Sequence, residues 1–231
     1  MDPGAPNLPE QILGVFTAPV PLFRRLSAAP RWGWAMVVTL GFTLVMVLIW
    51  AGQVDVDALF RPVLSRNPKL TPEMVEPIIE MYGRMLGLFG ALGVLLGLPS
   101  LSLFLAWIFW LVGRAAPGPG GSPSYRQALS AAVVPGLVSL PKALLIGSLC
   151  LLRPVRGLMP DALSPLSLGA WLGPGHGKLQ ALLTGFDGFL IANLILLFLA
   201  ARHLLGFKRG AALVSTAAAA AVIAGLVVMN R

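Results

Sequence analysis

The sequence predicts an all-α integral membrane protein with five transmembrane helices and an N-terminal interfacial amphipathic segment. The chain has 231 residues, of which 57% are hydrophobic and 11% charged, whereas a typical soluble domain is roughly 45–50% apolar and about 25% charged. Several uncharged stretches also reach or exceed the about 20 residues that one helical crossing requires. A water-soluble fold of this composition could not cover its surface, so hydrocarbon is expected to solvate much of the chain.

The predicted spans follow from the gaps between successive charged residues. Residues 32–54, 85–113 and 210–230 contain no Asp, Glu, Lys or Arg, and two further apolar stretches are interrupted only by Lys142 and by Arg202. We expect an interfacial segment at 1–31 and a membrane domain at 32–231, with spans at about 32–52, 85–112, 128–152, 186–205 and 210–229.

Composition also excludes several classes of protein. The formal net charge is +8, but the cations stand singly or in pairs at the ends of apolar stretches, which is typical of membrane anchoring and not of nucleic-acid binding. Cys150 is the only cysteine, so neither an intramolecular disulfide nor a cysteine metal cluster is expected. The proline-rich first 31 residues lack a long apolar core, so we expect the first span, and no cleavable signal, to direct insertion.

Anchoring residues flank the first span. Trp32 and Trp34 stand at one end of it and Trp50 at the other, and indole rings favour the headgroup level of a bilayer. Upstream, Leu22, Phe23 and Leu26 share one side of a short predicted helix, while Arg24 and Arg25 project elsewhere. This pattern favours a helix lying on an anionic leaflet.

The distribution of basic residues predicts the orientation. On one side of the membrane the predicted loops are short, basic and free of acids, which favours a cytoplasmic N-terminus. With five spans the C-terminus is then outside. Arginine strongly outnumbers lysine, and Ala, Gly and Pro are abundant, which is typical of a GC-rich bacterial genome and therefore of a bacterial inner membrane.

Small residues in the second and fifth spans predict close helix packing. In the second span, glycines recur every three or four residues, at Gly83, Gly87, Gly90, Gly93 and Gly97. The fifth span has an alanine-rich face from Ala217 to Ala221, extended by Ala224 and Gly225. Such faces let another helix approach closely, either within the same molecule or in a homodimer.

One charged residue lies well inside a predicted span. A lysine near mid-membrane costs roughly 2.5–3.5 kcal/mol on insertion scales, so Lys142 is expected to face protein and to find a partner. Ideal helix geometry places Lys142 and Asp187 at a similar depth, which predicts an ion pair with Asn193 as a polar neighbour. Alternatively, Lys142 extends past a helix broken at Pro141 to reach the outer surface. A small transporter would use the same pair as its substrate or proton site.

Enzymatic activity is not expected. The sequence contains neither an H-E-x-x-H helix nor a G-x-S-x-G turn, and His176 and His203 have no paired carboxylates nearby in sequence. Asp55 and Asp57 lack further ligands for a metal ion. We therefore predict no catalytic residue, cofactor or metal.

The order of features resembles the bacterial members of the Yip family, named for Ypt/Rab-interacting proteins. The resemblance lies in F-T-A-P at 16–19, P-L-F-R-R-L at 21–26 and an R-W pair before the first span, then in Y-R-Q-A-L at 125–129, a third span punctuated by proline, and F-D-G-F at 186–189. It covers most of residues 10–230.

This resemblance implies a five-helix membrane domain with a cytoplasmic N-terminus and no known chemistry. Eukaryotic relatives act in trafficking and membrane organisation, and some bacterial relatives are encoded beside ABC-type efflux machinery and help those complexes to assemble. The D-L-Y-G-P and G-Y motifs of the eukaryotic proteins are missing here, so Rab binding is not expected. The predicted function is that of a non-enzymatic adaptor for another membrane protein, with a small transporter as the alternative.

Overall fold

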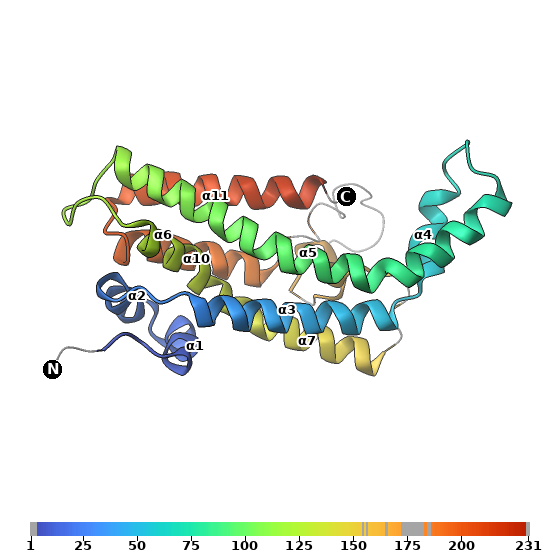
Figure 1. Cartoon of the computed structure of the whole chain (residues 1–231), viewed down its shortest axis with the longest axis horizontal. Helices are drawn as coiled ribbons and strands as arrows, with labels where there is room; N and C mark the ends of the chain where they lie inside the picture. Colours follow the sequence, from blue (N-terminus) through green and yellow to red (C-terminus); the bar gives the residue numbers. More distant parts are fainter. Residues whose placement is uncertain are drawn as a thin grey trace.

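The computed structural model describes residues 4–153, 155, 157–164, 166–171, 183 and 186–229, and His176 lies outside this part of the chain. The described residues form helices and no strand, in an elongated bundle (Figure 1). In chain order the elements are α1 (Leu8–Thr17), α2 (Pro19–Ala28), α3 (Gly33–Gln53), α4 (Val56–Leu64), α5 (Pro72–Ala115), α6 (Tyr125–Val133), the 3-10 helix η1 (Val134–Ser139), α7 (Leu140–Leu152), the 3-10 helix η2 (Pro160–Leu163), α8 (Leu168–Trp171), α10 (Gly188–His203) and α11 (Arg209–Met229).

Four helical stretches of the described chain are long and apolar enough to cross a membrane: Gly33–Gln53, Glu73–Ala115, Tyr125–Leu152 and Arg209–Leu226. The predicted span at 186–205 corresponds to α10, which is apolar but has 16 residues. At 1.5 Å per residue it is about 24 Å long, which is short of the ~30 Å hydrocarbon core. A fifth complete span therefore stays a prediction.

Local sequence signals set several helix boundaries. Asn7 and Glu10 form a capping box at the start of α1, and Ser124 and Gln127 form another at the start of α6. Each box satisfies two backbone N–H groups that would otherwise lack partners. The second box orients α6 at the beginning of the third membrane segment.

The long helix α5 projects beyond the rest of the bundle, together with α4 (Figure 1). Its 44 residues extend about 66 Å, roughly twice the hydrocarbon thickness. Outside the bundle, Phe60 of α4 stacks on Tyr82 of α5 with ring centroids 4.8 Å apart. Arg61 joins the two helices through Glu76 at 2.7 Å, and its hydrogen bonds to Asp57 lower the pKa of that carboxyl group.

The main hydrophobic core lies at the end of the bundle where Trp32 is found, which we call the Trp32 end. Here α2 packs against α10 and α6. Leu22 is 4% exposed, and Phe23 and Leu26 are fully buried. The expectation that this apolar side faces a lipid leaflet is therefore wrong, because the bundle itself covers these side chains. A membrane-surface position for α1 and α2 stays a prediction.

Candidate functional site

Lys142 and Asp187 are in contact inside the bundle. The Lys142 ammonium nitrogen (Nζ) lies 2.7 Å from Oδ2 of Asp187. The Asp187 side chain is 2% exposed and that of Lys142 is 21% exposed. The ion pair expected from helix geometry is thus present in the structure, and Lys142 faces Asp187 instead of extending only toward the surface.

Asp187 also starts α10. Its second oxygen, Oδ1, accepts a hydrogen bond of 2.8 Å from the backbone N–H of Leu190, so Asp187 is the N-cap of the helix. A carboxylate at this position satisfies a free N–H group and interacts favourably with the positive end of the helix dipole. Oδ1 of Asp187 is therefore hydrogen-bonded to the helix, while Oδ2 is in ion-pair contact with Lys142 without the alignment of a hydrogen bond.

The connection before α10 holds Asp187 in place from the other side. The backbone N–H of Leu168 donates to the carbonyl of Phe186 at 2.9 Å, and the N–H of Gly188 donates to the carbonyl of Leu166 at 3.2 Å. These bonds bracket Asp187 against Ser167, which is fully buried. Non-helical backbone at membrane depth is tolerated when it is buried in protein with its polar groups paired.

The pair lies within the length of the third membrane segment and not at its far end. Lys142 is the third residue of α7 and precedes its last residue, Leu152, by ten positions, or about 15 Å of helix. Since Asp187 contacts Lys142, α10 begins about that far inside the bundle.

Other buried polar atoms lie on α10 and on the connection before it. The Oδ1 atom of Asn193 and the Oγ atom of Ser164 are buried without a hydrogen-bond partner. Asn193 follows Asp187 by six residues, about 9 Å along α10, so it is outside the ion pair. Sequence reasoning missed Ser164 and Ser167 because small polar residues in a Pro/Gly/Ser-rich connection give no signal of burial.

The glycines of α5 divide into two groups. A Cβ atom on Gly90 would lie 2.7 Å from Cγ1 of Val47, while Cβ atoms on Gly83 and Gly87 would make ordinary contacts with Val56 and Ala51. Gly93 and Gly97 have no neighbouring atom within 4 Å of that position. The first group packs against α3 and the segment that follows it, and the second leaves an open surface.

The predicted anchors also differ from one another. Trp34 is 70% exposed at the start of α3, but Trp50 is only 5% exposed, and its indole N–H donates to the carbonyl of Leu158 at 2.8 Å. Trp50 is therefore no lipid-exposed anchor, because it packs inward and holds the connection after α7. Arg25 pairs with Glu10 at 3.0 Å, whereas Arg24 is exposed.

Within the described part of the chain, no group of three or more His, Cys, Asp or Glu side chains is placed to hold a metal ion. The ion pair of Lys142 and Asp187, which joins two membrane segments, is thus the main polar site of this region.

The family of the chain is shown by comparison with family models. The Yip1 domain model matches residues 13–229, which is nearly the whole chain. The chain belongs to the Yip1 family. Comparisons with curated proteins and with solved structures found no match. As a Yip1 family protein with several apolar helices of spanning length, it is a multi-pass membrane protein, and this family generally consists of non-enzymatic membrane proteins that interact with other membrane proteins and with lipids.

Proposed function

We propose that this Yip1 protein is a non-enzymatic adaptor of the bacterial inner membrane, with its N-terminus in the cytoplasm. It binds another membrane protein within the bilayer and assists its assembly. A subunit of an ABC-type efflux complex is the partner that we propose, on the basis of the bacterial resemblance described above. Family membership supports the general role, and the open helix surfaces support binding within the bilayer.

The observation that carries this proposal is an exposed apolar surface on α5. Gly93 and Gly97 are open, and Leu92 and Leu96 beside them are 42% and 66% exposed. Glycine at such positions allows a second helix to approach the backbone closely, and packing of this kind drives helix association in membranes. The exposed Ala217 of α11 adds a second small-residue position.

Cysteine crosslinking in native membranes tests where a partner binds. In a Cys150→Ala background, Gly97→Cys should crosslink to a second membrane protein that co-purifies in fixed stoichiometry. The matched control is Gly52→Cys on α3, where the glycine is also open but on another helix. Gly97→Leu should abolish co-purification and Gly52→Leu should preserve it. Crosslinks between two copies of this chain would instead indicate a homodimer, and equal crosslinking at both sites would contradict the proposal.

The alternative function is a small transporter that uses Lys142 and Asp187. The specific observation in its favour is the presence of unpartnered buried oxygens on Asn193 and Ser164, which a bound ion or water could satisfy. We favour the adaptor because both carboxylate oxygens of Asp187 are already engaged. Purified protein in liposomes with a pH-sensitive dye separates the two: a proton flux that Lys142→Ala abolishes would support the transporter, and an adaptor should give none.

A further inference from the structure

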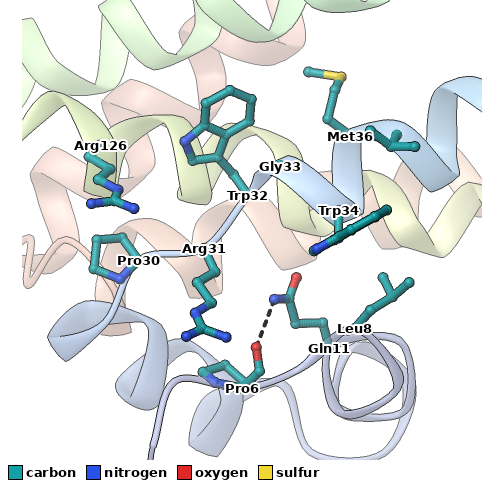
Figure 2. A pocket seen from close by; sticks show the side chains of 11 residues that line it. Pro6, Leu8, Gln11, Pro30, Arg31, Trp32, Gly33, Trp34, Met36 and Arg126 are labelled. Carbon is teal, nitrogen blue, oxygen red and sulfur yellow. Dashed lines mark hydrogen bonds between the residues drawn. The ribbon is translucent and has the colours of Figure 1, made fainter.

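A groove at the Trp32 end combines apolar walls with two arginines. It has a volume of about 620 Å³ and lies where α1, the start of α3 and the start of α6 meet. We call it the headgroup groove and define it by Gln11, Arg31, Trp32, Gly33, Trp34 and Arg126. Figure 2 shows Arg31 directed toward Pro6 and Arg126 toward Pro30, while the Trp32 indole projects from the chain on the side away from Arg31.

The cations of this groove have no acidic partner among the described residues. Glu10, which precedes Gln11 in the sequence, pairs instead with Arg25 at 3.0 Å. Arg31 and Arg126 are both exposed. Guanidinium groups form strong charge-assisted and often bidentate hydrogen bonds to phosphate, so the electrostatic character of the groove suits an anionic phosphate group.

A buried side chain and a helix end point into the same groove. Gln11 is 2% exposed; its amide nitrogen donates to the carbonyl of Pro6 at 3.1 Å, and its Oε1 atom has no partner. Figure 2 shows that oxygen directed toward the start of α3. There, Trp32 provides no side-chain cap, so the first N–H groups of a 21-residue helix are available to an anion. Gln11 Oε1 would accept a hydrogen bond from a hydroxyl group next to the phosphate.

The groove continues into the membrane. Val37 lines both the headgroup groove and a second groove of about 620 Å³ between α3 and α7. This second one, the acyl groove, is almost wholly apolar and includes Gly41, Val45, Ile49, Gly147 and Leu151. From Val37 to Ile49 it extends about 18 Å, close to the half-thickness of ~15 Å that one leaflet contributes to the hydrocarbon core.

We infer that the two grooves together bind one anionic phospholipid. Its phosphate lies between Arg31 and Arg126, a hydroxyl of its headgroup donates to Gln11, and one acyl chain lies along α3 and α7. The exposed indole of Trp34 lies at the mouth, at the level of the headgroups. A glycerol headgroup, as in phosphatidylglycerol, supplies both the negative charge and the hydroxyl donor.

Native mass spectrometry of the full chain with dioleoyl phosphatidylglycerol tests this inference, with dioleoyl phosphatidylcholine as the comparison lipid. The wild-type protein should retain one phosphatidylglycerol molecule in preference to phosphatidylcholine. The double substitution Arg31→Gln with Arg126→Gln should weaken that retention at least tenfold. The matched control, Lys208→Gln with Arg209→Gln, removes the same charge at the same end but outside the groove, and should retain the lipid.

A second substitution tests the acyl groove independently of charge. Gly41→Leu should also lower phosphatidylglycerol retention, because it fills the apolar path while both arginines remain. Inorganic phosphate should not compete with the lipid, since it gains nothing from the acyl groove. Equal losses in the groove and control variants, unchanged retention in the groove variants, or displacement by inorganic phosphate would overturn the inference. The lipid-binding test can fail or succeed independently of the adaptor proposal, because Gly97→Leu should abolish partner binding and leave phosphatidylglycerol retention intact.

Discussion

Asp187 performs two tasks at the scale of a single residue. One carboxylate oxygen caps α10 and the other binds the Lys142 ammonium group. A charged pair taken out of water costs desolvation energy, which is offset only when both groups find good partners. We therefore expect the pair to act mainly on specificity, by selecting which part of the third membrane segment meets the start of α10.

Lys142→Met should destabilise the protein by on the order of 2 kcal/mol, less than the ~3–5 kcal/mol typical of a fully buried pair, because Lys142 is 21% exposed. The loss arises because a buried carboxylate is left without its cation. Asp187→Asn in addition should recover much of that loss, since Asn is neutral and still caps a helix well. Thermal unfolding in mild detergent of both single variants and the double variant measures the coupling.

The comparison of the two single variants with the double variant depends on the choice of Asn at position 187. Exchanging the two charges would place lysine at the N-cap of α10, where lysine cannot accept the hydrogen bond from the Leu190 N–H group. The exchanged variant would therefore be destabilised even if the ion pair re-formed. Strictly additive effects of Lys142→Met and Asp187→Asn would show that the two side chains do not interact.

At the scale of elements, the 3-10 helix η1 determines the direction of Lys142. A 3-10 helix turns 120° per residue and an α-helix 100°, so the six residues of η1 rotate all that follows by about 120°. Pro135 lacks a backbone N–H and prevents a regular α-helical hydrogen bond there. A continuous α-helix from α6 through α7 would thus direct Lys142 about a third of a turn away from Asp187.

The contact between α3 and α5 gives a second prediction at this scale. Gly90→Ala should destabilise the protein by about 1–3 kcal/mol, because the added methyl group would overlap with Val47. Val47→Ala should relieve the overlap in the double variant. Thermal unfolding measures both.

Gly93→Ala is the matched control for Gly90→Ala. It lies on the same helix with open space around it, so it should be neutral or stabilise the helix by up to ~1 kcal/mol. If Gly90→Ala changed the thermal stability as little as Gly93→Ala, the inference that α3 and α5 approach closely at Val47 would be wrong.

At the scale of the whole molecule, charge is distributed unevenly along the bundle. Basic residues outnumber acidic ones in the segments at the Trp32 end, where Glu10 is the only acidic residue among those described. At the opposite end of the bundle (Figure 1), α4 and the start of α5 carry acids as well as bases. Positive charge is retained preferentially on the cytoplasmic side of a membrane. We therefore predict that the Trp32 end is cytoplasmic.

Labelling with a membrane-impermeant maleimide tests this orientation in a Cys150→Ala background. Arg66→Cys, between α4 and α5, should react in intact cells. Gly120→Cys, between α5 and α6, should react only after the membrane is opened. The reverse pattern would mean the opposite orientation, and reaction of both sites from outside would show that α5 does not cross the membrane.

The sequence alone determined the membrane class, most of the spanning stretches, the family resemblance and the similar depth of Lys142 and Asp187, because hydrocarbon constrains composition and ideal helix rise constrains depth. The structure decided that the two side chains meet, because the direction of Lys142 depends on η1. The sequence could not determine that α10 is short, that Trp50 and the apolar side of α2 are buried, or which glycines remain open. Those features depend on how helix surfaces fit together, and an apolar side chain has the same hydropathy whether it faces lipid or another helix. The headgroup groove likewise needed the tertiary structure, because Gln11, Arg31 and Arg126 come from three separate segments that only packing brings together.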